Sequence, residues 1–197
     1  MTPLRLPALA RRQAIVSAAL RVFSSSSYTG ATTAEIAREA GVSEPIIYRH
    51  FHSKRDLWFA CLEEAWDRFR TSIEERAEAL GDAESVRAVA QTGVRLRRER
   101  VLLPSLWLQG VTEAAEAPEV EKVVRRHLRE VHALIAGLVR RSQAAGGVPA
   151  DRDADAEAWL FVAGGLLVSV ADRLGGLLTP DDLRRIAEQR YRWLLDG

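Results

Sequence analysis

A 25-residue stretch that begins at Thr32, TTAEIAREAGVSEPIIYRHFHSKRD, constrains the fold most strongly, because it holds three helix starts and two sharp turns. Thr32 and Glu35 have the spacing of a capping box, in which each side chain hydrogen-bonds to the other's backbone. Gly41 ends this first helix at a position that favours a left-handed backbone. Ser43 is placed to cap a second helix. Two short helices joined by such a turn predict a helix-turn-helix.

The second helix of this motif would carry polar side chains that suit DNA. The major groove admits a helix, and Tyr48, Arg49 and His50 all donate hydrogen bonds to phosphates or base edges. Lys54 adds a cation at the start of the next helix. Glu44 could accept from a cytosine, or it could repel phosphates and only complement the helix N-terminus. The sequence leaves both roles of Glu44 open.

The run AGVSEPIIYRHFHSKRDL resembles the DNA-binding signature of the TetR family of bacterial transcriptional regulators, over roughly residues 10–60. The family pattern ends in Tyr-x-His-Phe and a following Lys, which are Tyr48, His50, Phe51 and Lys54 here. The resemblance implies a homodimeric regulator of double-stranded operator DNA, a repressor that a small-molecule ligand releases.

The resemblance also implies which residues contact DNA. Phosphates would be held by Thr33, Tyr48, His50 and Lys54. Base edges would be met by Ala34, Glu44, Pro45, Ile46 and Arg49, with Ser43 completing the surface. From the residues themselves, Arg49 is the best base reader, since Arg bidentate to guanine is the commonest specific contact.

Apolar periodicity predicts an all-α chain of about nine helices. The predicted domains are a helix-turn-helix DNA-binding domain, residues 1–54, and a helical ligand-binding and dimerisation domain, residues 55–197. One long helix would run from Ser53 to about Leu80 and join them, so that a movement of the body would tilt the DNA-binding part. Further helices are expected over about 9–24, 85–100, from Pro104, 118–144, 153–174 and from Pro180.

The predicted helix 153–174 contains WLFVAGGLLVSVA, thirteen residues that are apolar on every side. Such a helix must be covered all round, and we judge this stretch too short to span a bilayer. One side would face the chain's own core and the other a second copy, forming a four-helix bundle with the last helix of each chain. The expected dimer-interface residues are Trp159, Gly164, Leu167, Leu183 and Tyr191.

Aromatic residues in the body provide enough surface to line an apolar ligand pocket between helices. The candidates are Trp66, Phe69, Trp107 and Phe161, with Arg95, Gln109 and His132 as polar contacts. Taken singly, each aromatic residue is better explained as core packing, and the sequence leaves the choice between pocket and core open. The identity of the small-molecule effector is open too.

The distribution of charge and the absence of catalytic motifs limit the possible functions further. The chain has a net charge of +1, but its first 60 residues hold eight basic and four acidic side chains, so the remainder carries −3. A basic N-terminal part suits a protein that contacts DNA at one end. Phosphate-cradling, HExxH, CxxC and GxSxG motifs are absent from the sequence, so we expect no enzyme activity, cofactor or metal.

The single cysteine, Cys61, excludes a disulfide framework and fits a cytoplasmic protein. No run of eighteen apolar residues and no signal peptide is found, so no membrane association is expected. The alternative to a regulator is a helical ligand-binding or scaffolding protein whose helix-turn-helix no longer reads DNA. Glu44 at the start of the second helix is the feature that keeps this alternative open.

Overall fold

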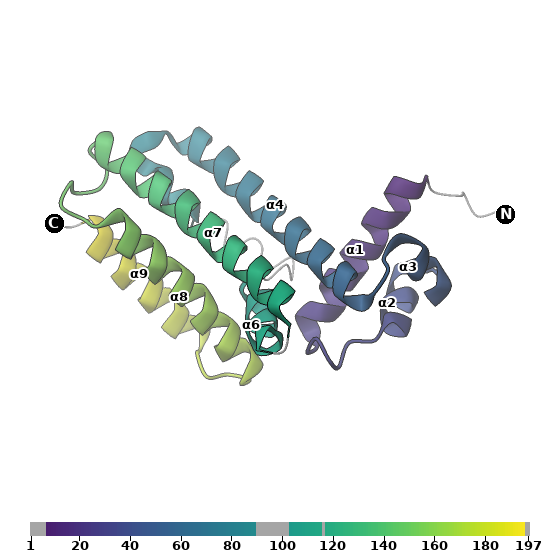
Figure 1. Ribbon diagram of the computed structural model, residues 1–197. Coiled ribbons are helices and arrows are strands. Elements are labelled where there is room, and N and C mark those ends of the chain that lie inside the picture. Colours follow the sequence, from purple (N-terminus) through teal and green to yellow (C-terminus); the bar gives the residue numbers. More distant parts are fainter. Residues whose placement is uncertain (1–6, 90–102, 116, 196–197) are drawn as a thin grey trace. The chain divides into compact units, whose positions relative to one another are not determined.

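The computed structural model describes residues 7–89, 103–115 and 117–195, and every regular element in these ranges is a helix (Figure 1). The predicted all-α class is therefore confirmed. The helices are α1 (Ala8–Ser25), α2 (Thr33–Ala40), α3 (Glu44–His50), α4 (Lys54–Leu80), η1 (Asp82–Glu84), α6 (Leu103–Ala114), α7 (Pro118–Ala144), α8 (Ala154–Arg173) and α9 (Pro180–Leu195). Residues 85–89 are helical as predicted; the remainder of the predicted helix 85–100, with Arg95, lies outside the described residues.

Side-chain caps set the starts of the later helices where the sequence places them. The Asp153 carboxylate accepts from the N–H groups of Asp155 and Ala156 at 3.0 and 3.1 Å, and α8 begins at the next residue. Thr179 and Asp182 form a reciprocal capping box at the start of α9. Each cap satisfies N–H groups that have no partner inside the helix.

The chain divides into two compact units, residues 1–67 and 68–197, and the division falls inside α4. The first turns of α4 belong to the N-terminal unit because Leu57 and Trp58 are buried there and the Cys61 thiol lies 3.7 Å from the Val16 carbonyl oxygen on α1. The sequence-based boundary after residue 54 lies before these contacts. The functional assignment of the two parts stays a prediction.

The second unit is built around α7 and α8, which lie side by side (Figure 1). α6 packs against both of them, and η1 packs against α7. Its core includes Leu106, Val131, Ala136 and Leu138, all with fully buried side chains. Hydrophobic burial of this kind contributes about 1.5–3 kcal/mol for each large apolar side chain.

The last helix, α9, is held differently, because none of its side chains is buried. Arginines make the contacts instead. Arg190 donates to the buried Glu157 carboxylate on α8, and Arg87 donates to the Tyr191 hydroxyl. The Arg152 guanidinium lies 4.5 Å from the centre of the Trp193 ring, a cation–π contact. Polar and cation–π contacts therefore help to attach α9 to the rest of its unit, beside half-buried apolar side chains such as Leu183 and Leu194.

The bounds of α8 agree with the predicted helix 153–174, but the expectation that this stretch is too short to span a bilayer is wrong. The helix has 20 residues, and its most apolar window has a mean hydropathy of 1.5, so it is long and apolar enough to cross a membrane by length and composition alone. The thirteen-residue apolar stretch underestimates it because the helix continues at both ends. Core helices of proteins without membrane spans meet the same criterion, and 33% of this window is buried within the chain.

A close backbone contact fixes the loop after α7. A Cβ atom at Gly147 would lie 1.8 Å from the Ala83 carbonyl oxygen and 2.7 Å from the Ser142 hydroxyl. That hydroxyl donates to the same Ala83 oxygen at 2.6 Å, and Gly147 N–H donates to the Ser142 carbonyl at 2.8 Å. Only glycine allows the loop to approach η1 this closely.

We therefore predict that Gly147→Ala lowers the free energy of unfolding by about 2–3 kcal/mol, because the new methyl group forces the backbones apart and breaks the Ser142 hydrogen bond. Gly137→Ala is the matched control: it lies inside α7 with nothing within 4 Å of the added Cβ, and should raise stability by about 0.5–1 kcal/mol. Urea unfolding followed by circular dichroism measures both. Equal effects of the two substitutions would contradict the close contact.

Candidate DNA-binding surface

The turn between α2 and α3 has the geometry that the sequence predicts. Thr32 N–H donates to the Glu35 carboxylate at 3.0 Å, and Glu35 N–H donates to the Thr32 hydroxyl at 3.2 Å, which completes the capping box. Gly41 has φ 66° and ψ 31°, the left-handed conformation. Its N–H and that of Val42 donate to the last carbonyls of α2 at 3.2 and 3.0 Å. The turn therefore fixes the direction in which α3 leaves α2.

The predicted side-chain cap by Ser43 is wrong: its hydroxyl makes no capping hydrogen bond. A cap of this kind accepts from the second or third N–H of the helix. The second residue is Pro45, which has no N–H. The third, Ile46, donates its N–H to the Ser43 carbonyl at 2.9 Å instead. The Ser43 side chain is therefore exposed and available at the surface.

Burial of Ile47 orients α3. Ile47 is 1% exposed and is the one buried residue of the helix, and Ile36 on α2 and Phe51 after α3 are buried too. The opposite side of α3 is therefore turned outward. Of the predicted DNA contacts, the structure leaves exposed Ala34, Ser43, Pro45, Tyr48 and Arg49; half-buried Glu44, Ile46, His50 and Lys54; and buried Thr33.

Thr33 joins two side chains of α3. Its hydroxyl donates to the Glu44 carboxylate and lies 3.1 Å from the Tyr48 hydroxyl oxygen. The Thr33 residue is 8% exposed, whereas Tyr48 is 49% exposed. The sequence places these three residues in one motif but gives no signal that they contact each other, because the contact depends on the angle between α2 and α3.

Lys54 lies where the sequence places a cation, but it has partners within the chain. Its ammonium group donates to the carbonyls of Tyr28 and Ala31 at 2.9 and 3.1 Å and lies 4.6 Å from the centre of the Tyr28 ring. An ammonium group has three donors, so one N–H remains for a phosphate. Lys54 also orders the loop between α1 and α2, which sequence spacing could not reveal.

Arg12 is a further cation that the sequence analysis did not single out. Its guanidinium lies 4.8 Å from the centre of the Phe51 ring, beside the end of α3, and the side chain is exposed. A residue about forty positions away in the sequence reaches the motif only because α1 packs against α2. The stacked guanidinium keeps its N–H groups available for an anion.

The predicted ligand-binding residues divide between the two units. Trp66 lies in the N-terminal unit; Phe69, Trp107 and Phe161 lie in the second. Phe69 and Phe161 stack, with ring centres 6.2 Å apart, and Trp107 is 2% exposed with no hydrogen-bond partner for its indole N–H among the described residues. The pocket role of these residues stays a prediction.

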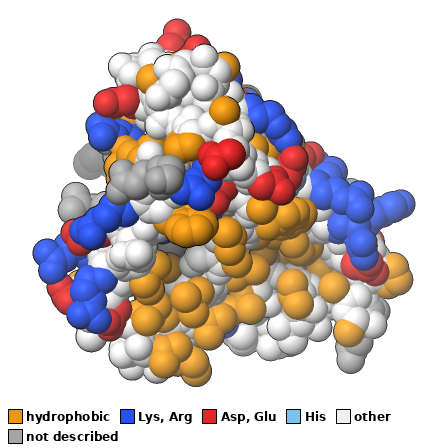
Figure 2. Space-filling model, turned by 90° about the vertical axis from the view of Figure 1, so that its left-hand side faces the viewer, with side chains coloured by type: hydrophobic (Ala, Val, Ile, Leu, Met, Phe, Trp, Pro, Cys, Tyr) orange, Lys and Arg blue, Asp and Glu red, His pale blue; other side chains and the backbone are white. Residues whose placement is uncertain are grey.

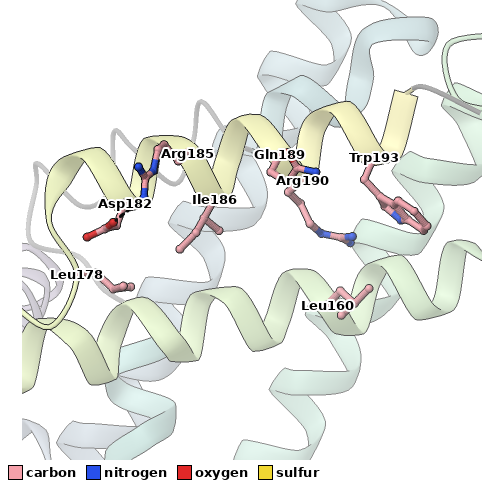
Figure 3. A pocket seen from close by; sticks show the side chains of 8 residues that line it. All are labelled: Leu160, Leu178, Asp182, Arg185, Ile186, Gln189, Arg190 and Trp193. Carbon is pink, nitrogen blue, oxygen red and sulfur yellow. Dashed lines mark ion pairs between the residues drawn. The ribbon is translucent and has the colours of Figure 1, made fainter.

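An open groove of about 820 Å³ lies between α8 and α9 (Figure 3). Leu160 on α8 forms one side, Leu178 lies in the loop before α9, and α9 supplies the other residues. The groove is mostly apolar and bordered by arginines. Its lining residues are Leu160, Leu178, Asp182, Arg185, Ile186, Gln189, Arg190 and Trp193. None of the four predicted ligand-binding aromatic residues lines it.

The predicted dimer residues lie on α8 and α9. Trp159 and Leu167 are 48% and 44% exposed in the single chain, and Leu183 and Tyr191 are half-buried. A Cβ at Gly164 would meet nothing within 4 Å, so this glycine faces open space, whereas one at Gly165 would lie 3.1 Å from Pro104 of α6. Only Gly164 could let another chain approach closely.

Comparison with known proteins bears on this arrangement. A sequence model of the family described as "Bacterial regulatory proteins, tetR family" matches residues 15–61, which include the whole α2–turn–α3 motif. The regulator BetI of Rhizobium meliloti (strain 1021) is 30% identical over 130 residues, covering 65% of this chain and 64% of BetI. The regulator HbdR of Aromatoleum sp. (strain CIB) is 40% identical over 70 residues, 36% of this chain and 31% of HbdR.

The chain belongs to the TetR family. It spans about a third to two thirds of the length of these curated relatives. A TetR-family regulator from Agrobacterium tumefaciens has the same fold, with a TM-score of 0.80 at 20% identity over 96% of this chain and all of that one. FadR from Bacillus subtilis, solved with stearoyl-CoA, has a TM-score of 0.73 at 18% identity, over 94% of this chain and 98% of FadR.

The capping box of this TetR-family protein leads to a prediction about pH. Hydrogen bonds from the Thr32 backbone and side chain lower the pKa of Glu35 below its ordinary value of 4.5. A lowered pKa means that the contribution of Glu35 to stability is present above the ordinary value and is lost as the pH falls through the lowered one. Thr32→Ala should raise the pKa of Glu35, as measured by NMR titration of its carboxyl carbon. Thr29→Ala, in the nearby loop, is the control and should leave that pKa unchanged.

Proposed function

We propose that this protein is a sequence-specific DNA-binding transcriptional regulator and not an enzyme. The observation that carries the proposal is the outward face of α3, which presents Tyr48 and Arg49 beyond a turn fixed by Gly41. The matching relatives are named as transcriptional regulators. A neighbour of the same fold, AibR, was solved with isovaleryl coenzyme A and operator DNA. These similarities support operator binding by this chain.

Arg49 is the residue that we assign to base recognition. Its side chain is exposed, and none of the ion pairs found among the described residues involves it. The guanidinium is therefore available for two parallel hydrogen bonds to guanine O6 and N7. Positioning on the phosphate backbone falls to His50, to the remaining N–H of Lys54 and to Arg12, all of which are donors near α3.

We propose further that two copies pair through α8 and α9. Hydrophobic side chains gather over part of the face shown in Figure 2, with Lys and Arg side chains toward its edges. The exposed large apolar side chains of these two helices are Trp159, Leu160, Leu167, Ile186 and Trp193. An apolar face of this kind is typical of a protein–protein interface. Pairing also suits DNA, because a two-fold dimer can contact two half-sites.

The proposed release mechanism requires a small effector in the second unit, in the cytoplasm. Support comes from FadR and AibR, which were solved with acyl-CoA molecules. In this chain the buried Trp107 and the Phe69–Phe161 stack supply aromatic surface for an apolar part of such a molecule. The Trp107 indole N–H could donate to it. A repressor is the form of regulation that this arrangement fits, with the effector lowering the affinity for the operator.

The test of the proposed function is binding of the purified full chain to its own upstream intergenic DNA, at several salt concentrations, against an unrelated duplex. The expected result is selective binding with a steep salt dependence, because each neutralised phosphate releases counterions. If the operator does not lie in the upstream intergenic DNA, a selection from random-sequence duplexes identifies the sequence that the protein binds. Weak and equal binding to every sequence in both experiments would contradict the proposal and favour the scaffold alternative.

Arg49→Ala should weaken operator binding by about 1–3 kcal/mol and relax the preference at one base pair. Lys54→Ala is the contrasting variant. It should weaken binding to all DNA sequences alike and make binding less dependent on salt, because Lys54 would contact only the phosphate backbone. Fluorescence anisotropy with a panel of single-base operator variants measures both. An equal loss on every sequence for Arg49→Ala would contradict the assignment of Arg49 as a base reader.

Leu167→Arg should convert the dimer to monomer, raising the dimer dissociation constant by roughly a hundredfold, because a charge would be buried without a partner at the interface. Val111→Arg is the matched control, since Val111 is 56% exposed on α6 in the same unit. Sedimentation equilibrium gives the dissociation constants, and circular dichroism checks that each variant folds. Retention of a tight dimer by Leu167→Arg would exclude this part of α8 from the interface.

A further inference from the structure

Three oxygen-bearing side chains form a continuous hydrogen-bonded chain at the start of α3. The Thr33 hydroxyl donates to the Glu44 carboxylate, and the Tyr48 hydroxyl oxygen lies 3.1 Å from the Thr33 hydroxyl oxygen. Glu44 and Tyr48 are four residues apart, so they lie on the same face of α3. Thr33, the central member, is nearly buried, whereas Tyr48 is half exposed.

Counting hydrogens gives this chain a direction. An ionised carboxylate only accepts, so the single hydrogen of the Thr33 hydroxyl is used by Glu44. Thr33 can then only accept from Tyr48, which must donate its own single hydrogen inward. What remains at the surface is acceptor capacity alone: lone pairs on the Tyr48 hydroxyl oxygen and the second carboxylate oxygen of Glu44, for which no partner is found among the described residues.

We propose that Glu44 and Tyr48 together read a base that presents an amino group in the major groove, and that Thr33 is the positioning residue that turns both toward it. Cytosine N4 and adenine N6 are the two amino groups available there. Phosphates offer only acceptors, so a phosphate cannot bond to a tyrosine whose hydrogen is already used. Thr33 and Tyr48 then serve specificity, in place of the phosphate contacts that the family resemblance implies.

This inference rests on the proposed function and assigns to Glu44 the first of its two open roles, contact with a base. A carboxylate near DNA repels phosphates in every sequence, so it costs affinity everywhere. A direct contact with a base amino group offsets that cost only where such a base is present. Glu44 therefore makes binding more selective by weakening it on the wrong sequences, while Thr33 keeps the carboxylate in place.

The experiment begins with selection of a motif from random duplexes by the full-length wild-type protein. Affinities for the selected motif and for all single-base variants are then measured for wild type, Glu44→Met, Thr33→Val and Tyr48→Phe. Glu39→Met controls for the loss of one carboxylate in the same unit, and Thr29→Val controls for the loss of a hydroxyl. Circular dichroism and thermal unfolding confirm that each variant folds.

We expect one cytosine or adenine position at which the wild type discriminates by about tenfold. All three test variants should lose preference at that same position and keep it elsewhere, while both controls keep it throughout. Replacing that base by its analogue without the amino group, pyrimidin-2-one for cytosine or purine for adenine, should weaken binding by the wild type but not by Glu44→Met, which has lost the acceptor. The same analogue at a distant position should affect neither protein.

Two results would overturn the inference alone. One is a uniform loss of affinity for Tyr48→Phe across all sequences, which would place its hydroxyl on a phosphate. The other is an unchanged base preference in Glu44→Met. Failure of the wild type to select any motif would instead overturn the proposed function, and this inference with it.

Discussion

The cores of both compact units depend on one helix, α4. Leu57 and Trp58 are 0% and 1% exposed in the N-terminal unit, and Ile73 is 0% exposed in the second. Neither core is complete without its own section of α4, and the unbroken helix from Lys54 to Leu80 joins the two sections. The transmission of a tilt along this helix stays a prediction. Because each section of α4 contributes core residues to one unit, unfolding of either section directly removes part of the core of that unit.

Local signals in the sequence predict much of this fold, because caps and turns are decided by a few adjacent residues. The capping box at Thr32 and the left-handed Gly41 form as the spacing predicts, and Thr179 and Asp182 form a box with the same spacing. The long helices α4 and α7 have bounds close to those predicted from apolar periodicity. The cap predicted at Ser43 fails for an equally local reason, since Pro45 removes the N–H that the hydroxyl would accept from.

The rest depends on contacts between distant residues, and no spacing rule predicts those. Lys54 is tied to the carbonyls of Tyr28 and Ala31, more than twenty positions earlier. Thr33 reaches Glu44 and Tyr48 only at the angle that the turn sets between α2 and α3. Sequence reasoning therefore locates the candidate surface and most of its exposed residues. It assigns their hydrogen-bonding roles less well, because donor and acceptor capacity depends on which partners each group already has.

The way α9 is attached has a consequence for how the protein responds to dilution. None of its side chains is fully buried within one chain. It is held in part by three arginine contacts, which join Arg190 to Glu157, Arg152 to Trp193 and Arg87 to Tyr191. If a second copy covers α9 and the exposed face of α8, the missing burial is supplied by association, so the stability of this end of the chain follows mass action. The melting temperature would then rise with protein concentration, and newly made chains would become resistant to proteases only after enough of them had accumulated to pair.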